Sequence, residues 1–465
     1  MIPSNEQSQE GNGQLSSTYK TAAAPATADL TLEDSLQKLV KAGGFDFLEA
    51  VIDGLQNLNP ERKARKKIFL TDEDKQYERK ALLKKIQLWQ ALLKESDSVG
   101  AILENCQNRT DSVDTNFKKN IGIALDATRD LEQAYRSLHL FYKNTETDKP
   151  GNIVILNASM DQITDLDNPR FIEYVAEELK QNFDRLDLRD NYSLMVIPGY
   201  LGSNKMIERW GKIAHQNKVM LVTDFANLEQ PDDVIDLFTS ANLTGGDAFR
   251  SNVIMTCNWL VGRGKVSDAG ELEPLFVPGS AALAGKMYLT LMSQVTAGKK
   301  HGGMNEADGV RFDLKKSEIS HLERIGLVPM VDEYGKVMAF SAKTLFNGDN
   351  IGLQTYSVVR VFDYITKVLF DFLNRRAFEN WNTKTEQDLR SQIVKFLDHI
   401  QGPDRLIERF KIMRFERDEV QKDRIHLDIH ITPYFPAKSF VVKLDGHKGE
   451  DEHTTWATEY NQQAK

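Results

Sequence analysis

The chain has 465 residues, of which 41% are hydrophobic and 27% charged, and its formal net charge at pH 7 is -9. This composition is that of a water-soluble protein with more than one hydrophobic core, and its acidic balance disfavours general nucleic-acid binding. The two cysteines, Cys106 and Cys257, lie far apart in the sequence, which argues against a disulfide framework and a cysteine-based zinc cluster and suits a reducing cytoplasm.

Residues 1–30 are rich in Ser, Gln, Ala, Asn and Gly and carry few large apolar side chains. Such a segment buries too little surface to offset the entropy of ordering, so we expect a flexible arm. It has neither a basic start nor an apolar run, and no later segment approaches the roughly 18 uninterrupted apolar residues of a membrane span. The sequence therefore predicts neither export nor direct membrane insertion.

Residues 31–148 are predicted to be mostly helical. Two short amphipathic helices follow the arm, and their apolar faces include Leu36, Leu39, Phe45, Leu48 and Ile52. The basic run Arg62–Lys67 has no aromatic neighbours that would stack on bases, so a solvated loop or an acidic protein partner explains it better than nucleic acid. Thr71 is the expected N-cap of a long helix that reaches Leu93, and a further helix is predicted over 117–142.

The pattern changes over residues 149–350, where strands and helices are predicted to alternate. Short apolar runs predict strands at 152–157, 193–199, 218–225 and 252–261, and helical patterns occupy 169–186, 203–216 and 231–240. This alternation favours right-handed crossovers onto a largely parallel sheet with helices on both faces. The predicted class is a wound α/β core within an α+β chain.

The last part is predicted to contain a helical pair, terminal strands and a polar tail. The helices are expected at 353–381 and 386–400, within a region 351–402 that Gly402-Pro403 ends. Residues 403–445 carry strand patterns, and 446–465 are predicted to be a polar tail. In the stretch "RIHLDIHITPYFPAKSFVVKLDG", Ile425, Leu427, Ile429 and Ile431 share one face of a strand.

The opposite face of that strand carries His426, Asp428 and His430. Alternate residues on a strand lie roughly 6 to 7 Å apart, so neighbouring members of this row are spaced to chelate a zinc ion. A solvent-facing polar row is the commoner explanation, because half-buried strands carry such rows routinely. We expect no metal here, and a metal-dependent enzyme remains an alternative.

Three loops are candidates for a nucleotide site. The stretch Gly279–Met287 resembles a phosphate loop, but it has five residues between its glycines and no hydroxyl after the lysine, which favours a closely packed helix. The loops after Gly199 and Asp224 follow predicted strands, where α/β sheets bind ligands. They lack the dinucleotide fingerprint, so a structural core is expected, without a cofactor, and a nucleotide-dependent enzyme is the alternative.

Several motifs resemble those of a known family. The stretch "SLHLFYKNTETDKPGNIVILNAS" (137–159) is similar to the helix-to-strand junction of the large subunit of the type VI secretion contractile sheath, the TssC family; Leu138, His139, Asn144, Thr145, Glu146 and Thr147 match. "IGLVPMVDEYGKVMAFSAKTLF" (325–346) looks like the family's Gly-Leu-Ile-Pro-Leu segment. Arg360, Tyr364 and Lys367 match its Arg-x-x-His-Tyr-x-Lys helix, while Asp363 replaces the histidine. The strands around "TPYFPA" resemble the family's final hairpin.

Two family segments are absent from this sequence, an Arg-Phe-Leu-x-Arg-x-Pro-Tyr-Gly stretch and a Trp-Leu-x-x-Tyr-Val segment. Their absence suggests a divergent branch like that of Bacteroidota. The resemblance implies a structural protein without catalysis, which pairs with a small sheath subunit and polymerises helically around an inner tube of stacked rings. Contraction of the sheath then propels the tube and its effectors.

The resemblance also implies partners and a location. The implied partners are the small subunit, neighbouring sheath protomers, the inner tube, a baseplate and an AAA+ disassembly ATPase. The implied location is the cytoplasm, with the sheath anchored through the baseplate at the inner membrane. In this family neighbouring protomers exchange strands at the C-terminal end of the large subunit.

The sequence offers residues for these contacts. A regular strand near a chain end with a free edge is suited to strand addition. We therefore expect strand exchange through Ile425, Leu427, Ile429 and Ile431 and, on the following strand, Phe440, Val442 and Leu444. The apolar faces that include Leu36, Leu39, Phe45, Leu48 and Ile52 are expected to pack against the small subunit, because helices this short do not form a good core alone.

Overall fold

The computed structural model describes residues 37, 41, 60–95, 98–146, 150–438, 441–447 and 454–461. The chain divides into two units, one ending at Asn120 and the other beginning at Ile121. No helix among the described residues has the length and apolar character that crossing a membrane requires.

The described part of the first unit is helical. It contains α3 (Pro60–Thr71), the 3-10 turn η1 (Glu73–Lys75), α4 (Gln76–Glu95) and the first half of the 46-residue helix α5 (Val99–Asn144). The basic run that we predicted to be a loop lies inside α3, because Lys and Arg are good helix formers and Pro60 suits a first helical position. Thr71 ends α3 rather than capping the next helix, and Asp72 caps η1 by accepting from the Asp74 N–H at 3.1 Å.

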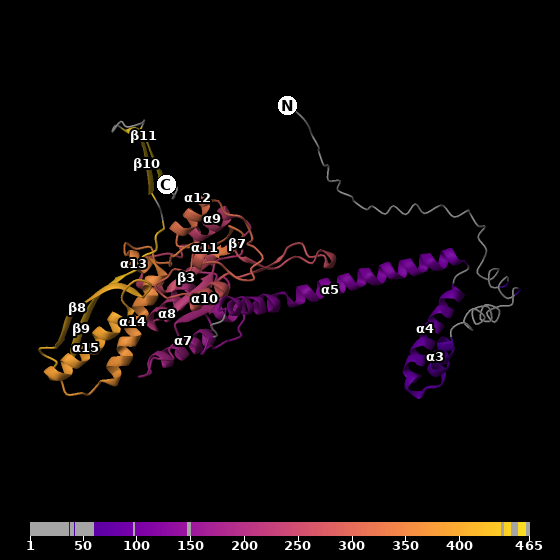
Figure 1. Ribbon diagram of the computed structural model, residues 1–465, viewed down its shortest axis with the longest axis horizontal. Helices are drawn as coiled ribbons and strands as arrows, with labels where there is room; N and C mark the ends of the chain where they lie inside the picture. Colours follow the sequence, from indigo (N-terminus) through magenta and orange to yellow (C-terminus); the bar gives the residue numbers. More distant parts are fainter. Residues whose placement is uncertain are drawn as a thin grey trace, which may run out of the picture. The chain divides into compact units, whose positions relative to one another are not determined.

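The second unit is built on a five-stranded sheet (Figure 1). Its order is β1-β2-β3-β6-β7, in which the first four strands are parallel and β7 is antiparallel to β6. The bounds are β1 (Leu194–Ile197), β2 (Met220–Asp224), β3 (Val253–Cys257), β6 (Val328–Glu333) and β7 (Lys336–Ala339). The hairpin between β6 and β7 turns at Tyr334 and Gly335, which both have positive φ (57° and 73°), as the tight turn of a two-residue hairpin requires.

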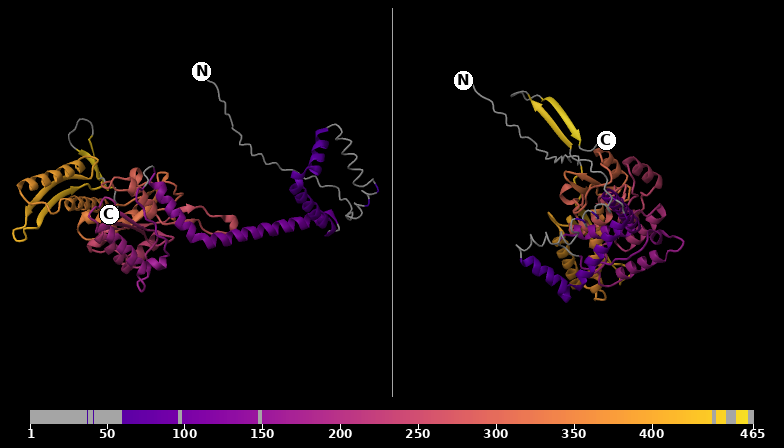
Figure 2. Two further views of the ribbon diagram at one scale, coloured as in Figure 1. Left: turned by 90° about the horizontal axis from the view of Figure 1, so that it is seen from below. Right: turned by 90° about the vertical axis from the view of Figure 1, so that its right-hand side faces the viewer.

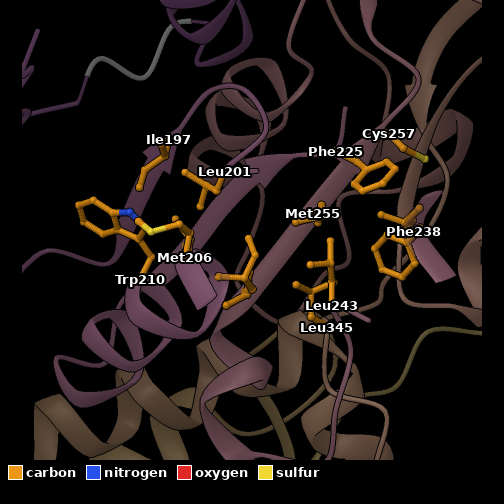
Figure 3. Packing of buried hydrophobic residues seen from close by; sticks show 14 of the residues in the cluster. Ile197, Leu201, Met206, Trp210, Phe225, Phe238, Leu243, Met255, Cys257 and Leu345 are labelled. Atoms are coloured by element: carbon orange, nitrogen blue, oxygen red, sulfur yellow. The ribbon is translucent and has the colours of Figure 1, made fainter. Parts of the chain in front are cut away.

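Side chains alternate between the two faces of the sheet and build two hydrophobic cores. On one face Leu221, Met255 and Val331 pack with helices α7 (Arg170–Phe183), α8 (Asn204–Gln216), α9 (Pro231–Ala241) and α12 (Lys316–Arg324). Figure 3 shows part of this core, with Trp210 and Met206 of α8 beside Ile197 and Leu201, and Phe225 beside Phe238 and Cys257. On the other face Met220, Val222 and Ile254 pack with α5, α10 (Ser280–Leu289) and α14 (Tyr356–Arg375). The wound α/β class predicted from the sequence is confirmed.

Shorter elements connect these layers. They are α6 (Met160–Thr164), η2 (Ala248–Asn252), β4 (Leu260–Arg263), η3 (Ser267–Ala269), β5 (Leu275–Val277), α11 (Gly298–His301) and α13 (Ile351–Gln354). β4 and β5 form a separate antiparallel pair, so the predicted strand 252–261 is two strands, interrupted near Asn258, which has a φ of 66°.

The predicted strand at 152–157 is wrong. This segment has no assigned strand, and none of the backbone hydrogen bonds of the described residues involves it. Its apolar side chains Ile153, Val154, Ile155 and Leu156 are between 40% and 57% exposed. The run has the composition of a buried strand, but a strand also needs a neighbouring strand with which to pair. In this chain the five-stranded sheet ends at β1, so the run has no partner among the described strands.

A third core joins the C-terminal helices and strands. α14, α15 (Thr383–Ile400), β8 (Ile407–Arg417) and β9 (Ile425–Pro433) enclose residues such as Ile365, Ile393 and Phe415 (Figures 1 and 2). The single helix predicted at 353–381 is two helices separated at Thr355, and the second ends at Arg375.

The C-terminal strands form two hairpins. β9 pairs with β8, whereas β10 (Val441–His447) pairs with β11 (Thr454–Asn461), as the right-hand view of Figure 2 shows. The strands flanking "TPYFPA" are therefore not partners of each other, which corrects the hairpin that the resemblance implied. β11 lies within the segment predicted to be a polar tail, where Thr454, Thr455, Trp456 and Tyr460 supply residues that favour strands.

Candidate assembly surfaces

The β8–β9 hairpin leaves a strand edge open. Ile412 lies opposite Ile429 and Phe415 opposite Leu427 in an antiparallel ladder. Within the described part of the chain β9 pairs with β8 alone, so its other edge carries N–H and C=O groups without a ladder partner. Such an edge is able to accept a further strand.

The side chains predicted for strand exchange have two kinds of surroundings. Ile425, Leu427, Ile429 and Ile431 are partly buried in the core that α14 and α15 form, so they fix the hairpin to the helices. Val442 on β10 is 42% exposed, and Leu444 lies on the same strand. Phe440 and all five residues predicted to contact the small subunit, Leu36, Leu39, Phe45, Leu48 and Ile52, lie outside the described residues.

The polar face of β9 makes its own contacts. His426 Nε2 lies 2.7 Å from Asp418 Oδ2, across the turn that joins β8 to β9. That hydrogen bond, with the N–H groups of Gln421 and Val420, lowers the pKa of Asp418. Asp428 and His430 are exposed and lie opposite Arg414 and Lys411. Among the described residues no three His, Cys, Asp or Glu side chains are grouped to hold a metal ion.

The second surface is an apolar stripe along α5 that the sequence analysis did not single out. Leu131, Tyr135, Leu138 and Tyr142 are spaced by four, three and four residues and are between 36% and 70% exposed. This spacing places them on one face of the helix, in the manner of a coiled-coil seam. This four-three-four spacing of apolar residues is visible in the sequence and could have predicted the stripe. Leu103, Val113 and Phe117, earlier on the same helix, are also exposed.

Ion pairs on another face of α5, in the half that begins at Ile121, hold this helix to the rest of the second unit. Arg263 on β4 donates to both carboxylate oxygens of Glu132 (2.9 and 3.1 Å) and to both of Glu271 (2.7 and 2.9 Å). Arg136 donates to the Gly262 carbonyl at 2.8 Å. The hydrogen bonds from Arg263 lower the pKa of Glu271 to about 2 against the cost of burial. The apolar stripe is thus presented by a helix whose position is fixed.

The three loops considered for nucleotide binding meet at one buried carboxylate. Asp224 Oδ2 accepts from the Gly199 N–H (2.9 Å) and the Ser280 hydroxyl, and Oδ1 accepts from the Ser280 N–H (2.8 Å) and the Thr256 hydroxyl. Asp224 is fully buried, which raises its pKa, while these hydrogen bonds oppose the shift. A side chain of the protein therefore occupies the amino end of α10, where a phosphate would bind. The expectation that 279–287 is a closely packed helix is confirmed.

Comparison with known families follows this architecture along the chain. Residues 32–121 match the N-terminal region of TssC/VipB-like proteins, 123–347 match the central domain of type VI secretion system TssC/VipB, and 355–462 match the TssC/VipB-like C-terminal domain. A search of curated proteins finds no match.

Several solved structures are similar to part of this chain. The anti-feeding prophage baseplate is 16% identical, with 67% of this chain and 80% of that chain covered and a TM-score of 0.46. A chain of the contracted helical sheath of the anti-feeding prophage is 16% identical, with 69% of this chain and 82% of that chain covered and a TM-score of 0.45. A chain of the contracted PVC sheath complex, from an extracellular contractile injection system, is 14% identical, with 66% of this chain and 98% of that chain covered and a TM-score of 0.42.

The three consecutive family matches define a structural subunit of a contractile sheath rather than an enzyme. The chain belongs to the TssC/VipB family, the large sheath subunit of type VI secretion systems.

Proposed function

We propose that this large subunit pairs with a small sheath subunit and that the pairs wind helically around an inner tube, which sheath contraction drives outward with its effectors. The consecutive matches to all three regions of one sheath family support this proposal. The same proposal includes attachment of the sheath to a baseplate and its recycling by an AAA+ ATPase. It also places the sheath in the cytoplasm, anchored at the inner membrane. The two missing family segments support a divergent, Bacteroidota-like branch.

Strand exchange at the C-terminal end is proposed to join neighbouring protomers. The open edge of β9 supports this role, because its inward-facing isoleucines and Leu427 already hold the strand in an extended, rigid form. About five ladder bonds at roughly 1 kcal/mol each contribute about 5 kcal/mol per junction before ordering costs. β10, with Val442 and Leu444, is the second proposed element, together with Phe440.

The helical region 31–148 is proposed to bind the small subunit. The exposed stripe on α5 supports this proposal, since a seam of this spacing on a fixed helix fits a partner helix. The proposed surface also includes Leu36, Leu39, Phe45, Leu48 and Ile52. Exposed Leu83, Ile86 and Trp89 on α4 supply further apolar area that a partner would cover.

Co-expression of the chain with the small subunit encoded beside it, followed by electron microscopy, tests the assembly. We expect hollow tubes with a cogwheel cross-section. A soluble monomer that does not associate with the small subunit and carries a bound nucleotide would overturn the proposal and favour the enzyme alternative.

A double substitution tests the α5 surface directly. Leu131→Glu with Tyr135→Glu is expected to abolish co-purification of the small subunit, because two carboxylates would be buried in an apolar seam. Leu131→Met with Tyr135→Phe keeps the apolar character at the same positions and is expected to leave binding intact. Equal binding by both double variants would rule out this stripe as the contact.

A further inference from the structure

A cavity of about 370 Å³ lies at the amino ends of β1 and β2, against α14. This end of the sheet is opposite the end where Asp224 fills the space between the loops. The charged residues that line it are Arg189, Lys218, Arg360, Lys367, Asp363 and Asp371.

Two of these cations are buried and lack a carboxylate partner. Arg360 and Lys367 are each only 8% exposed, and neither has a carboxylate oxygen within 4 Å among the described residues. Arg360 Nη2 donates to the Met287 carbonyl at 3.1 Å, while Nη1 is buried without a hydrogen-bond partner. Lys367 Nζ donates to the Tyr192 carbonyl at 2.6 Å. Burial lowers the pKa of Arg360 to about 10 and that of Lys367 to about 8.

The other charged groups on the wall are already engaged. Asp363 accepts from Asn252 Nδ2 at 2.7 Å and lies 3.6 Å from Lys218 Nζ. Asp371 accepts from the Leu188 N–H at 3.1 Å and pairs with Arg375, which lies outside the cavity wall. Arg189 pairs with Asp187. Among the described residues, Arg360 and Lys367 therefore have no carboxylate in direct contact, although the negative charge of Asp363 acts on the Lys367 ammonium from nearby, and two such buried charges are costly unless an anion or ordered water completes the site.

An unpaired acceptor lies on the same wall. Asn191 Oδ1 is buried without a hydrogen-bond partner, and Asn191 lines the cavity together with Arg360. The site thus offers donors with positive charge and one acceptor. A tetrahedral oxyanion in its singly protonated form carries groups complementary to this set, because its oxygens accept from cationic N–H donors and its hydroxyl donates to an amide oxygen.

We propose that this cavity binds a small tetrahedral oxyanion of the phosphate class. α14 belongs to the region matched by the C-terminal model, whereas β1 and β2 belong to the region matched by the central model. The bound anion would therefore link the sheet to the helices that carry β8 and β9.

Titration of the full-length chain with inorganic phosphate, at constant ionic strength in chloride buffer, tests the proposal by calorimetry. We expect one saturable site, with acetate binding more weakly because it carries one charge and no hydroxyl. Lys367→Met is expected to weaken phosphate binding roughly tenfold or more, the effect of losing one charge-assisted contact. Lys212→Met, which removes an exposed lysine of α8 that pairs with Glu208, is the matched control and is expected to change nothing.

Two further variants keep the test decisive if Lys367→Met does not fold. Lys218→Met alters a partly exposed cation of the wall and is expected to weaken binding several-fold. Asp363→Asn removes a negative charge from the wall and is expected to strengthen it. Absence of saturable binding to the wild-type chain would show that water alone fills the cavity. Binding that Lys218→Met and Asp363→Asn leave unchanged would place the phosphate elsewhere. Either outcome overturns the proposal.

Discussion

Asp224 shows how one side chain replaces a ligand in this fold. Each of its oxygens accepts one backbone N–H, Oδ2 from Gly199 and Oδ1 from Ser280. An asparagine at this position would direct its NH₂ group at one of these N–H donors in either orientation of the amide. The carboxylate is thus specifically required to join the end of β1 to the start of α10.

We therefore expect Asp224→Asn to lower the free energy of unfolding by about 2–3 kcal/mol, the cost of a buried donor that loses its acceptor. Urea denaturation followed by circular dichroism measures this change. Asp236→Asn, at an exposed position on α9, is the control and is expected to stay within about 0.5 kcal/mol of the wild type. A small effect at Asp224 would contradict the structural role assigned to this carboxylate.

Glu271 makes the docking of α5 dependent on pH. The hydrogen bonds from Arg263 lower the pKa of Glu271 in the folded chain to about 2, whereas the carboxyl of an unfolded chain titrates near its ordinary value of about 4.3. A carboxyl whose pKa is lower in the folded chain stabilises the fold fully when the pH is above its pKa in the unfolded chain. This stabilisation is lost as the pH falls through its pKa in the folded chain.

Glu271→Gln is accordingly expected to melt at a lower temperature than the wild type at pH 7, with the difference shrinking between pH 4 and pH 2. Thermal melts of both proteins across this range provide the measurement. A difference that stays constant down to pH 2 would show that the ionised carboxylate does not contribute through Arg263.

At the scale of elements, the contact between α10 and α5 depends on one glycine. A Cβ on Gly285 would lie 2.3 Å from the Phe141 carbonyl oxygen, so any larger residue would force the two helices apart. Gly285→Ala is expected to destabilise the chain by about 1–3 kcal/mol through overpacking. Gly100→Ala, whose nearest neighbour atom would be Ser98 Oγ at 3.9 Å, is expected to stabilise α5 by up to about 1 kcal/mol. Urea denaturation of both variants separates the packing effect from helix propensity.

The elements that the sequence predicted well are the central strands of the sheet. The strands predicted at 193–199 and 218–225, and the first part of the run 252–261, are mainly apolar because helices cover both sides of the sheet. The run at 152–157 has the same composition but no partner strand, and composition does not report pairing. β11 was missed because its polar residues were taken for a tail, although its Thr, Trp and Tyr residues favour strands.

The contacts of the sites were less predictable than the elements. The loops after Gly199, Asp224 and Gly279 were each named as candidates, but their convergence on one carboxylate depends on pairings 25 and 56 residues apart in sequence. The cavity beside α14 combines residues from 188 to 371, and no local pattern joins them. The open edge of β9 was predicted from its alternation, although its pairing with β8 was not.

At the scale of the whole molecule, assembly through the β9 edge predicts different effects of proline at two adjacent residues of β9. In an antiparallel ladder the N–H groups of consecutive residues point to opposite edges. Of Ile429 and His430, one therefore donates toward β8 and the other toward the open edge. Ile429→Pro and His430→Pro each remove one donor and also restrain φ at nearly the same place.

Both proline variants are expected to abolish tube formation with the small subunit while the α/β core stays folded, as judged by electron microscopy and circular dichroism. The variant that removes the outward N–H is expected to keep more of the thermal stability of the unassembled chain, because its lost bond exists only in the sheath. His426→Ala with His430→Ala keeps every backbone donor and is expected to form normal tubes. Normal tubes from both proline variants would contradict strand exchange through β9, and loss of tubes in the histidine variant would instead assign assembly to the side chains of its polar face.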